Sequence, residues 1–134
     1  MGRLLPVLII GILALPTTAA LAQPADAPAN RISPAVCGNW KADPSSGAIG
    51  RWTLRQRDDG GDWMGPWDIE LTSDGKFLEA GASVGVWCSQ GDLVIFGFNS
   101  SPYTAYRATL SANALTGHQS WDGGGTGTFE AVRK

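Results

Sequence analysis

Apolar and polar side chains alternate at every second position over much of residues 36–134. The run 67–72 shows this alternation throughout, which is typical of a β-strand with one buried face and one face in water. The pair Asp74-Gly75 follows this run and favours a tight hairpin turn. We therefore predict that residues 77–80 return antiparallel to it.

The rest of this region contains further short runs of the same kind, separated by turn residues, and none with the period of an amphipathic helix. The run 93–96 is apolar at every position, which indicates a strand that is covered on both sides. The candidate strands are 38–42, 51–57, 67–72, 77–80, 84–88, 93–98, 103–111, 115–121 and 127–133.

Short connections between consecutive strands favour an up-and-down antiparallel meander. Closing the meander would remove its exposed edges, so we predict an all-β barrel of about eight strands, with a two-sheet sandwich as the alternative. A barrel of this size is either filled by its own side chains or holds one small molecule, and strand number does not distinguish the two.

Residues 1–22 have the pattern of a signal peptide, in which one arginine precedes a short apolar run and a small-x-small cleavage site. Cleavage after Ala22 would leave a Pro- and Ala-rich segment, 23–35, that we expect to be a flexible tail before a barrel domain at 36–134. No later run approaches the length of a membrane span. We therefore expect a periplasmic or secreted protein without integral membrane association.

Charge argues against nucleic acid as a partner. The chain has 10 Lys and Arg against 12 Asp and Glu, and loss of Arg3 with the signal peptide leaves nine against twelve. A net charge near −3 offers no excess of cations for phosphates.

The only cysteines, Cys37 and Cys88, both lie in the part expected to be exported. An oxidising compartment favours their pairing, so we predict one disulfide, with two buried free thiols as the alternative.

Nothing in the sequence indicates an enzyme, a metal site or a cofactor. His118 is the single histidine, and we expect it to be structural rather than part of a catalytic triad. Asp58, Asp59 and Asp62 lack the spacing of a calcium loop, and a solvated hairpin tip explains them better.

Six tryptophans in so short a chain exceed what a small core requires. We expect Trp67 and Trp87 on interior faces, and Trp52 and Trp121 inside or at an open end. Trp63, in a loop before a strand, is expected to be exposed. The residues expected to line a ligand site are Trp52, Trp63, Trp67, Trp87, Phe96, Tyr106 and Trp121.

The triplet Gly38-Asn39-Trp40 near the start and Arg133 at the end resemble the calycin superfamily, which contains lipocalins, fatty-acid-binding proteins and avidins. The resemblance implies a barrel in which the indole of Trp40 packs under the guanidinium of Arg133. A cysteine directly before the triplet is similar to the position of the avidin disulfide.

The chain also resembles small exported barrels that inhibit bacterial metalloproteases, which share one disulfide, a Gly-x-Trp start and an N-terminal tail. Two hypotheses follow for a non-enzymatic exported protein. The first is binding of a small apolar or aromatic ligand in the lumen. The second is protease inhibition, or other binding of an exported protein, through the tail and loops.

Overall fold

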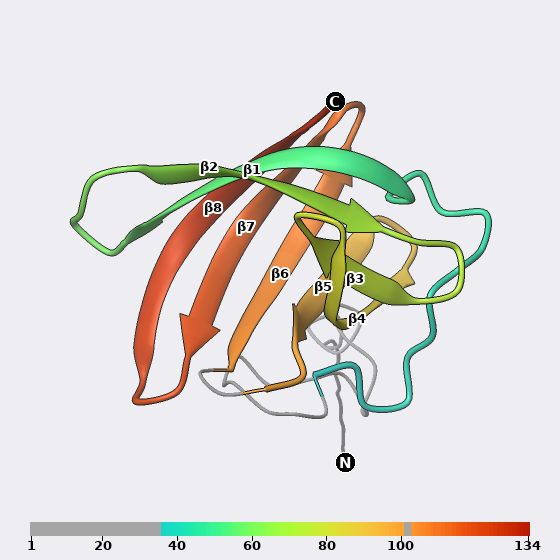
Figure 1. Ribbon diagram of the computed structural model, residues 1–134, viewed down its shortest axis with the longest axis horizontal. Helices are drawn as coiled ribbons and strands as arrows, with labels where there is room; N and C mark the ends of the chain where they lie inside the picture. Colours follow the sequence, from blue (N-terminus) through green and yellow to red (C-terminus); the bar gives the residue numbers. More distant parts are fainter. Residues whose placement is uncertain (1–35, 101–102) are drawn as a thin grey trace, which may run out of the picture.

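The computed structural model describes residues 36–100 and 103–134, so the predicted signal peptide (1–22) and tail (23–35) lie outside the described residues. Eight antiparallel strands follow one another along the chain (Figure 1). They are β1 (Gly50–Asp58), β2 (Met64–Leu71), β3 (Lys76–Glu79), β4 (Ala82–Gln90), β5 (Leu93–Phe98), β6 (Thr104–Ser111), β7 (Ala114–Trp121) and β8 (Gly125–Arg133).

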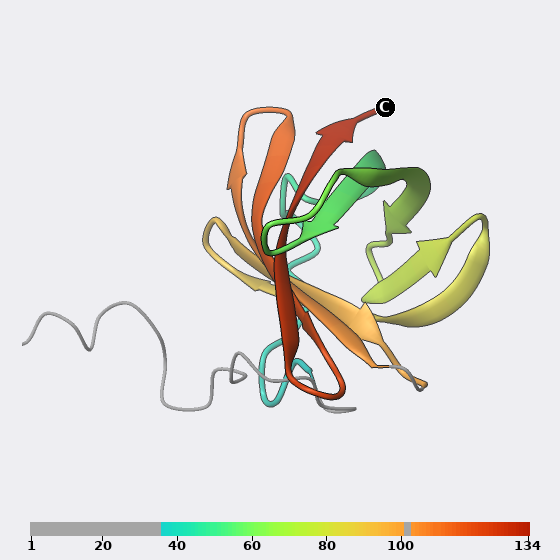
Figure 2. The same ribbon diagram turned by 90° about the vertical axis from the view of Figure 1, so that its left-hand side faces the viewer.

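Each strand pairs with the next one in the sequence, and β1 pairs with β8 to close the barrel. The closing register places Trp52 opposite Arg133 and Asp58 opposite Gly127. Figure 2 shows the strongly twisted strands curving around a common interior. The predicted up-and-down barrel is confirmed, and the alternative of two packed sheets is not observed.

The β2–β3 hairpin turns where the Asp74-Gly75 pair predicts it. Gly75 has a φ of 87°, a left-handed conformation that glycine adopts without the clash of a Cβ. The Thr72 amide donates to the Lys76 carbonyl across the turn, and the Thr72 hydroxyl also contacts Asp74. These bonds fix the register in which β3 returns along β2.

The first candidate strand, 38–42, is wrong. Residues 36–39 form turns, and the Trp40 amide donates to the Cys37 carbonyl at 2.9 Å. Gly38 has a φ of 56°, which is incompatible with an extended strand. The segment 36–49 instead begins on the outside of the barrel and ends at the start of β1, where Ala48 packs into the barrel core (Figure 1).

The predicted disulfide between Cys37 and Cys88 is present and ties this outer segment to β4. Val36 and Trp40 pack with Cys88 and Ile95 in a small cluster on the outside of β4 and β5. A separate, larger cluster fills the barrel. Strand β5 is therefore covered on both sides, as its continuous apolar run predicts.

The β1–β2 hairpin projects beyond the rest of the barrel (Figure 1). Strand β3 is short and pairs with β2 only from Ile69 to Leu71. The first half of β2 therefore has β1 on one side and no strand of the described part on the other. Among the described residues, no helix is long and apolar enough to cross a membrane.

Candidate functional site

The barrel interior is occupied by aromatic side chains. Phe96 stacks on Tyr106 with 4.6 Å between ring centroids, and Phe129 meets both rings edge-on. Phe77 packs edge-on against Phe96 from the other side. Phe96 and Tyr106, two residues expected to line a ligand site, thus contact each other inside the barrel.

Two of the predicted site tryptophans also belong to this core. The Trp52 indole N–H donates to the Ala48 carbonyl at 2.9 Å, and the Trp87 indole N–H donates to the Thr72 carbonyl at 2.6 Å. Both side chains are buried. Their polar groups are satisfied within the protein, which is typical of packed core tryptophans.

Trp121 is half-buried in the β7–β8 hairpin. A Cβ on Gly125 would lie 2.2 Å from the Trp121 ring, so the indole lies directly against the backbone of the opposing strand. Its position reflects packing over the turn between the two strands.

A polar layer borders the aromatic core. The Tyr106 hydroxyl donates to Gln56 Oε1 at 2.7 Å, and Gln119 Nε2 donates to the Arg57 carbonyl at 3.1 Å. Burial raises the pKa of the Tyr106 hydroxyl, and the negative charge of Glu79 raises it further. This tyrosine is therefore a neutral hydrogen-bond donor that tethers β6 to β1.

The expected contact between Trp40 and Arg133 is wrong, because Arg133 covers Trp52 instead. The Arg133 guanidinium lies 4.2 Å from the centre of the Trp52 ring and donates to the Ile49 carbonyl at 3.1 Å. Gly50 allows this approach, since a Cβ there would lie 2.9 Å from an Arg133 nitrogen. The Gly-x-Trp triplet that meets the final arginine is thus Gly50-Arg51-Trp52.

Trp67 also departs from its predicted interior position, because 38% of its surface is exposed. It shares a strand face with Ile69, which is buried, and pairs with Leu54 on β1. The physical reason is the shortness of β3, which covers Ile69 but ends before it reaches Trp67.

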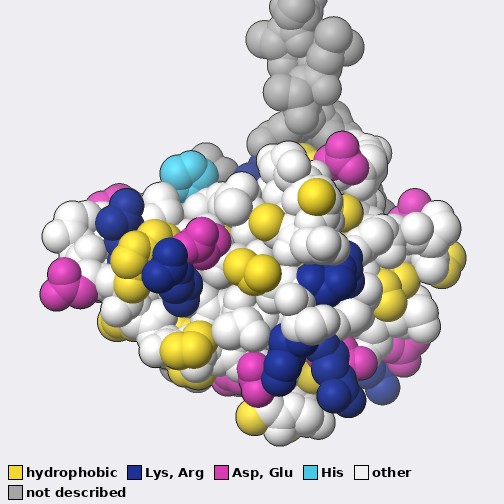
Figure 3. Space-filling view, turned by 90° about the horizontal axis from the view of Figure 1, so that it is seen from above, with side chains coloured by type: hydrophobic (Ala, Val, Ile, Leu, Met, Phe, Trp, Pro, Cys, Tyr) yellow, Lys and Arg dark blue, Asp and Glu magenta, His cyan; other side chains and the backbone are white. Residues whose placement is uncertain are grey.

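An exposed apolar group on the outer wall is the Trp63 patch, which we define as Trp63, Met64, Pro66 and Val132. Exposed fractions are 38% for Trp63, 42% for Met64 and 54% for Val132. The members come from the loop before β2, the start of β2 and the end of β8, and they line a depression of about 380 Å³. In Figure 3, hydrophobic side chains at the projecting end of the molecule lie among Lys and Arg side chains.

Two arginines of β1 hold the exposed indole. The guanidinium carbons of Arg55 and Arg57 lie 4.4 Å and 4.7 Å from the centre of the Trp63 ring. Arg55 also forms an ion pair with Glu130 of β8, and Arg57 Nε donates to Thr128 Oγ1 at 3.3 Å. Cation–π contacts of this kind restrain the ring while leaving part of it exposed.

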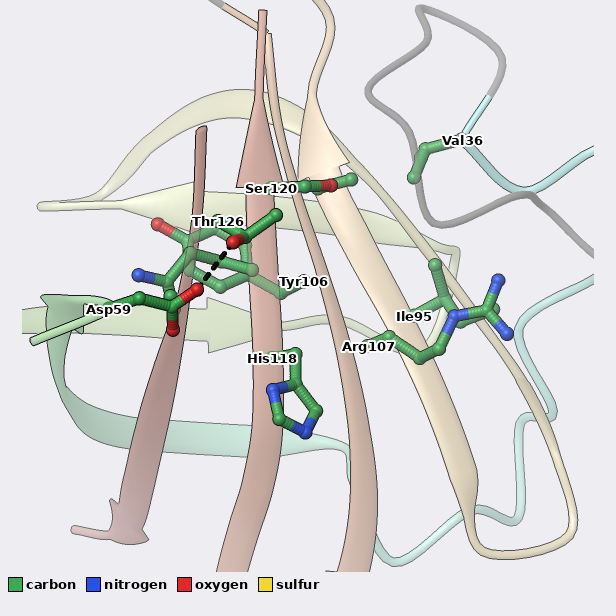
Figure 4. Close-up of a pocket in the computed structure, with 11 residues that line it drawn as sticks. Val36, Asp59, Ile95, Tyr106, Arg107, His118, Ser120 and Thr126 are labelled. Carbon is green, nitrogen blue, oxygen red and sulfur yellow. Dashed lines mark hydrogen bonds between the residues drawn. The ribbon is translucent and has the colours of Figure 1, made fainter. Parts of the chain in front are cut away.

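Two further depressions continue the same wall. One, of about 590 Å³, shares Trp63 and Glu130 with the depression at the patch and extends to His118 and Arg107. The next, of about 400 Å³, shares His118 and Arg107 and reaches Val36. Figure 4 shows Val36 and Asp59 at opposite sides of this last depression, with His118 on the strand between them.

Polar and apolar side chains alternate along this wall. It offers guanidinium donors, hydroxyl groups and apolar side chains. Among residues 36–100 and 103–134, no three His, Cys, Asp or Glu side chains are grouped so that they could hold a metal ion.

Our reading of the sequence identified Trp63 but not Arg55, Arg57 or Val132 as members of a site. The alternation in β1 carried part of this signal. Trp52 and Leu54 point inward, so Arg55 and Arg57, one and three positions after Leu54, point outward. Val132 could not be found in this way, because it meets the patch only through the pairing of β8 with β1.

Comparison with known proteins adds no relative to this description. No protein-family model matches the chain, and neither a curated protein nor a solved structure matches it. The functional interpretation therefore rests on the described surface and core.

Proposed function

We propose that this chain is a non-enzymatic exported binding protein that binds a partner protein through the outer wall of β1, β2 and β8, with the Trp63 patch at the centre of the contact. The observation that carries the proposal is an exposed indole held between Arg55 and Arg57 beside exposed Met64 and Val132. Tryptophan and arginine dominate the energetics of protein interfaces, and methionine is enriched there.

Preorganisation supports this assignment. A side chain that is already restrained loses less conformational entropy when a partner orders it. Trp63 is restrained by two guanidinium groups, and Arg55 is itself fixed by Glu130. The indole can therefore act as a rigid anchor for an apolar surface of the partner.

The extent of the surface favours a protein over a small molecule. Three adjoining depressions run from Val132 past Trp63 and His118 to Val36. Small-molecule sites are concave and bury most of their ligand, whereas a shallow, continuous wall suits a large partner.

We further propose that the barrel is calycin-like. Gly50-Arg51-Trp52 at the start of β1 and Arg133 at the end of β8 supply the indole and guanidinium that the resemblance implies. The disulfide supports an exported, periplasmic or secreted location. Protease inhibition through residues 23–34 stays a prediction, because those residues lie outside the described part.

A photo-crosslinking amino acid at position 64 tests the proposed surface. Incubated with the exported proteins of the source cell, the Met64 variant is expected to capture a protein that can be identified and purified. The same amino acid at Ser83, an exposed position on β4, is the control and should not capture it. Trp63→Ser should then weaken binding of the purified partner by about tenfold or more, as expected for an interface hot spot. Equal capture at both positions, or unchanged affinity of Trp63→Ser, would contradict the proposal.

Binding of a small apolar or aromatic ligand in the lumen stays a prediction, and the packed core argues for a lumen filled by side chains. Such a ligand would have to separate Phe96 from Tyr106 and displace rings around Trp87. We expect titration with fatty acids and hydrophobic dyes to leave the fluorescence of the buried tryptophans unchanged. Saturable quenching that persists in Trp63→Ser would instead indicate a ligand inside the barrel.

A further inference from the structure

The register of the sheet aligns two arginines, a threonine and a histidine in one row across the outer wall. Arg57 on β1 pairs with Thr128 on β8, Thr128 with His118 on β7, and His118 with Arg107 on β6. These four side chains alternate with inward-facing residues, so all of them lie on the outer wall. Neighbouring strands are about 4.8 Å apart, so the row extends over about 14 Å.

The row contains no acidic residue, although the chain as a whole carries a net charge of −2. In the described part of the chain, the ion pairs include Arg51–Glu70, Arg55–Glu130, Lys76–Asp74 and Lys134–Asp68. Arg57 takes part in none of them. Glu130 and Asp59 lie beside the row, where Glu130 pairs with Arg55 and Asp59 accepts a hydrogen bond from Thr126. An arginine outside these ion pairs can pair with a carboxylate of a partner.

Arg57 is held in a geometry suited to a carboxylate. Its Nε donates to Thr128 Oγ1, and its guanidinium rests on the Trp63 ring. The planar guanidinium of an arginine donates two parallel hydrogen bonds to a carboxylate. Restraint of the side chain lowers the conformational entropy that it loses on binding. The same guanidinium is also in contact with the Trp63 patch, so acidic and apolar recognition meet at this residue.

We infer that the partner presents an extended polypeptide segment in which acidic side chains lie next to apolar ones, with a carboxylate on Arg57 and an apolar side chain against Trp63 and Met64. This inference rests on the proposed protein-binding function. A polypeptide carries both groups, whereas a sulfated glycan supplies only the anion. Nucleic acid is disfavoured because its consecutive phosphates need several cations, whereas a single arginine such as Arg57 suffices for a carboxylate.

The test uses two fluorescently labelled ten-residue peptides, one alternating Leu with Glu and one alternating Leu with Gln. In fluorescence polarisation at low salt, the Glu peptide is expected to bind at least tenfold more tightly than the Gln peptide, with the difference shrinking as salt is added. Arg57→Gln should reduce the affinity for the Glu peptide to that for the Gln peptide. Arg51→Gln is the matched control, because Arg51 is an exposed arginine of the same strand outside the row, and it should leave both affinities unchanged.

Equal affinity for the two peptides, or an unchanged affinity of Arg57→Gln for the Glu peptide, would overturn the inference that the partner segment is acidic. Absence of binding by the Glu peptide would overturn it as well. Tighter binding of a sulfated oligosaccharide of equal charge would overturn the choice of a polypeptide. The crosslinking result at position 64 and the effect of Trp63→Ser on the captured partner do not depend on these peptides, so failure here remains distinguishable from failure of the proposed function.

Discussion

We expect the double replacement of Cys37 and Cys88 by alanine to lower the free energy of unfolding by roughly 4 kcal/mol. The disulfide joins positions 51 residues apart, and a crosslink across a loop of that length strongly restricts the unfolded chain. Small domains have a total stability of about 5 to 15 kcal/mol, so the loss is a large share. The native state also loses a tether, because the bond holds Val36 and Trp40 against β5.

Urea unfolding monitored by tryptophan fluorescence measures this change. The reduced wild-type protein serves as the comparison, because it lacks the crosslink but keeps both sulfur atoms. It should unfold at nearly the same urea concentration as the double variant. A double variant as stable as the oxidised wild type would show that the crosslink does not stabilise the barrel.

The strands could largely be predicted from the sequence because their signals are local. Alternation at the end of β2 and in β7 reflects which side chains face the core, and Asp74-Gly75 fixes the turn between β2 and β3. Short connections then leave little choice beyond pairing of neighbours, and removal of open edges favours closure.

The choice between two Gly-x-Trp triplets could not be made from the motif alone. Gly38-Asn39-Trp40 directly follows the disulfide cysteine, while Gly50-Arg51-Trp52 begins a run in which inward and outward residues alternate. Pro44 and Gly47 interrupt any strand that would continue from the first triplet. The longer alternating run after Gly50-Arg51-Trp52 indicates that this triplet, with Trp52, begins the first strand.

The candidate site could be predicted only in part, because its residues meet through long-range pairing. Exposure of Trp63 follows from its place in a polar, glycine-rich loop. The row from Arg57 to Arg107 depends on the register of four strands, and a shift by one residue would turn each side chain inward. Exposure of Trp67 likewise depends on the length of β3. The alternation of residues in β2 gives no information on that length.

Trp52→Ala is expected to destabilise the protein by about 3 to 5 kcal/mol, as large-to-small replacements of buried aromatic residues do. Trp52 is fully buried, donates to the Ala48 carbonyl and supports the guanidinium of Arg133. Its removal leaves a cavity at the end of the barrel and frees the connection before β1. The free energy of unfolding from urea titration measures the loss, and the exposed Trp63→Ala, which should cost much less, is the control.

A double-mutant cycle tests whether the guanidinium contact itself contributes. The cycle between Trp52→Leu and Arg133→Gln should give a coupling energy of about 0.5 to 2 kcal/mol, the range of cation–π contacts. The matched cycle between Trp40→Leu and Arg133→Gln should give a value near zero, because Trp40 packs with Cys88 and Ile95 on the outside of the sheet. Coupling confined to Trp40 would restore the original pairing, whereas coupling confined to Trp52 establishes Gly50-Arg51-Trp52 as the triplet that closes this end of the barrel.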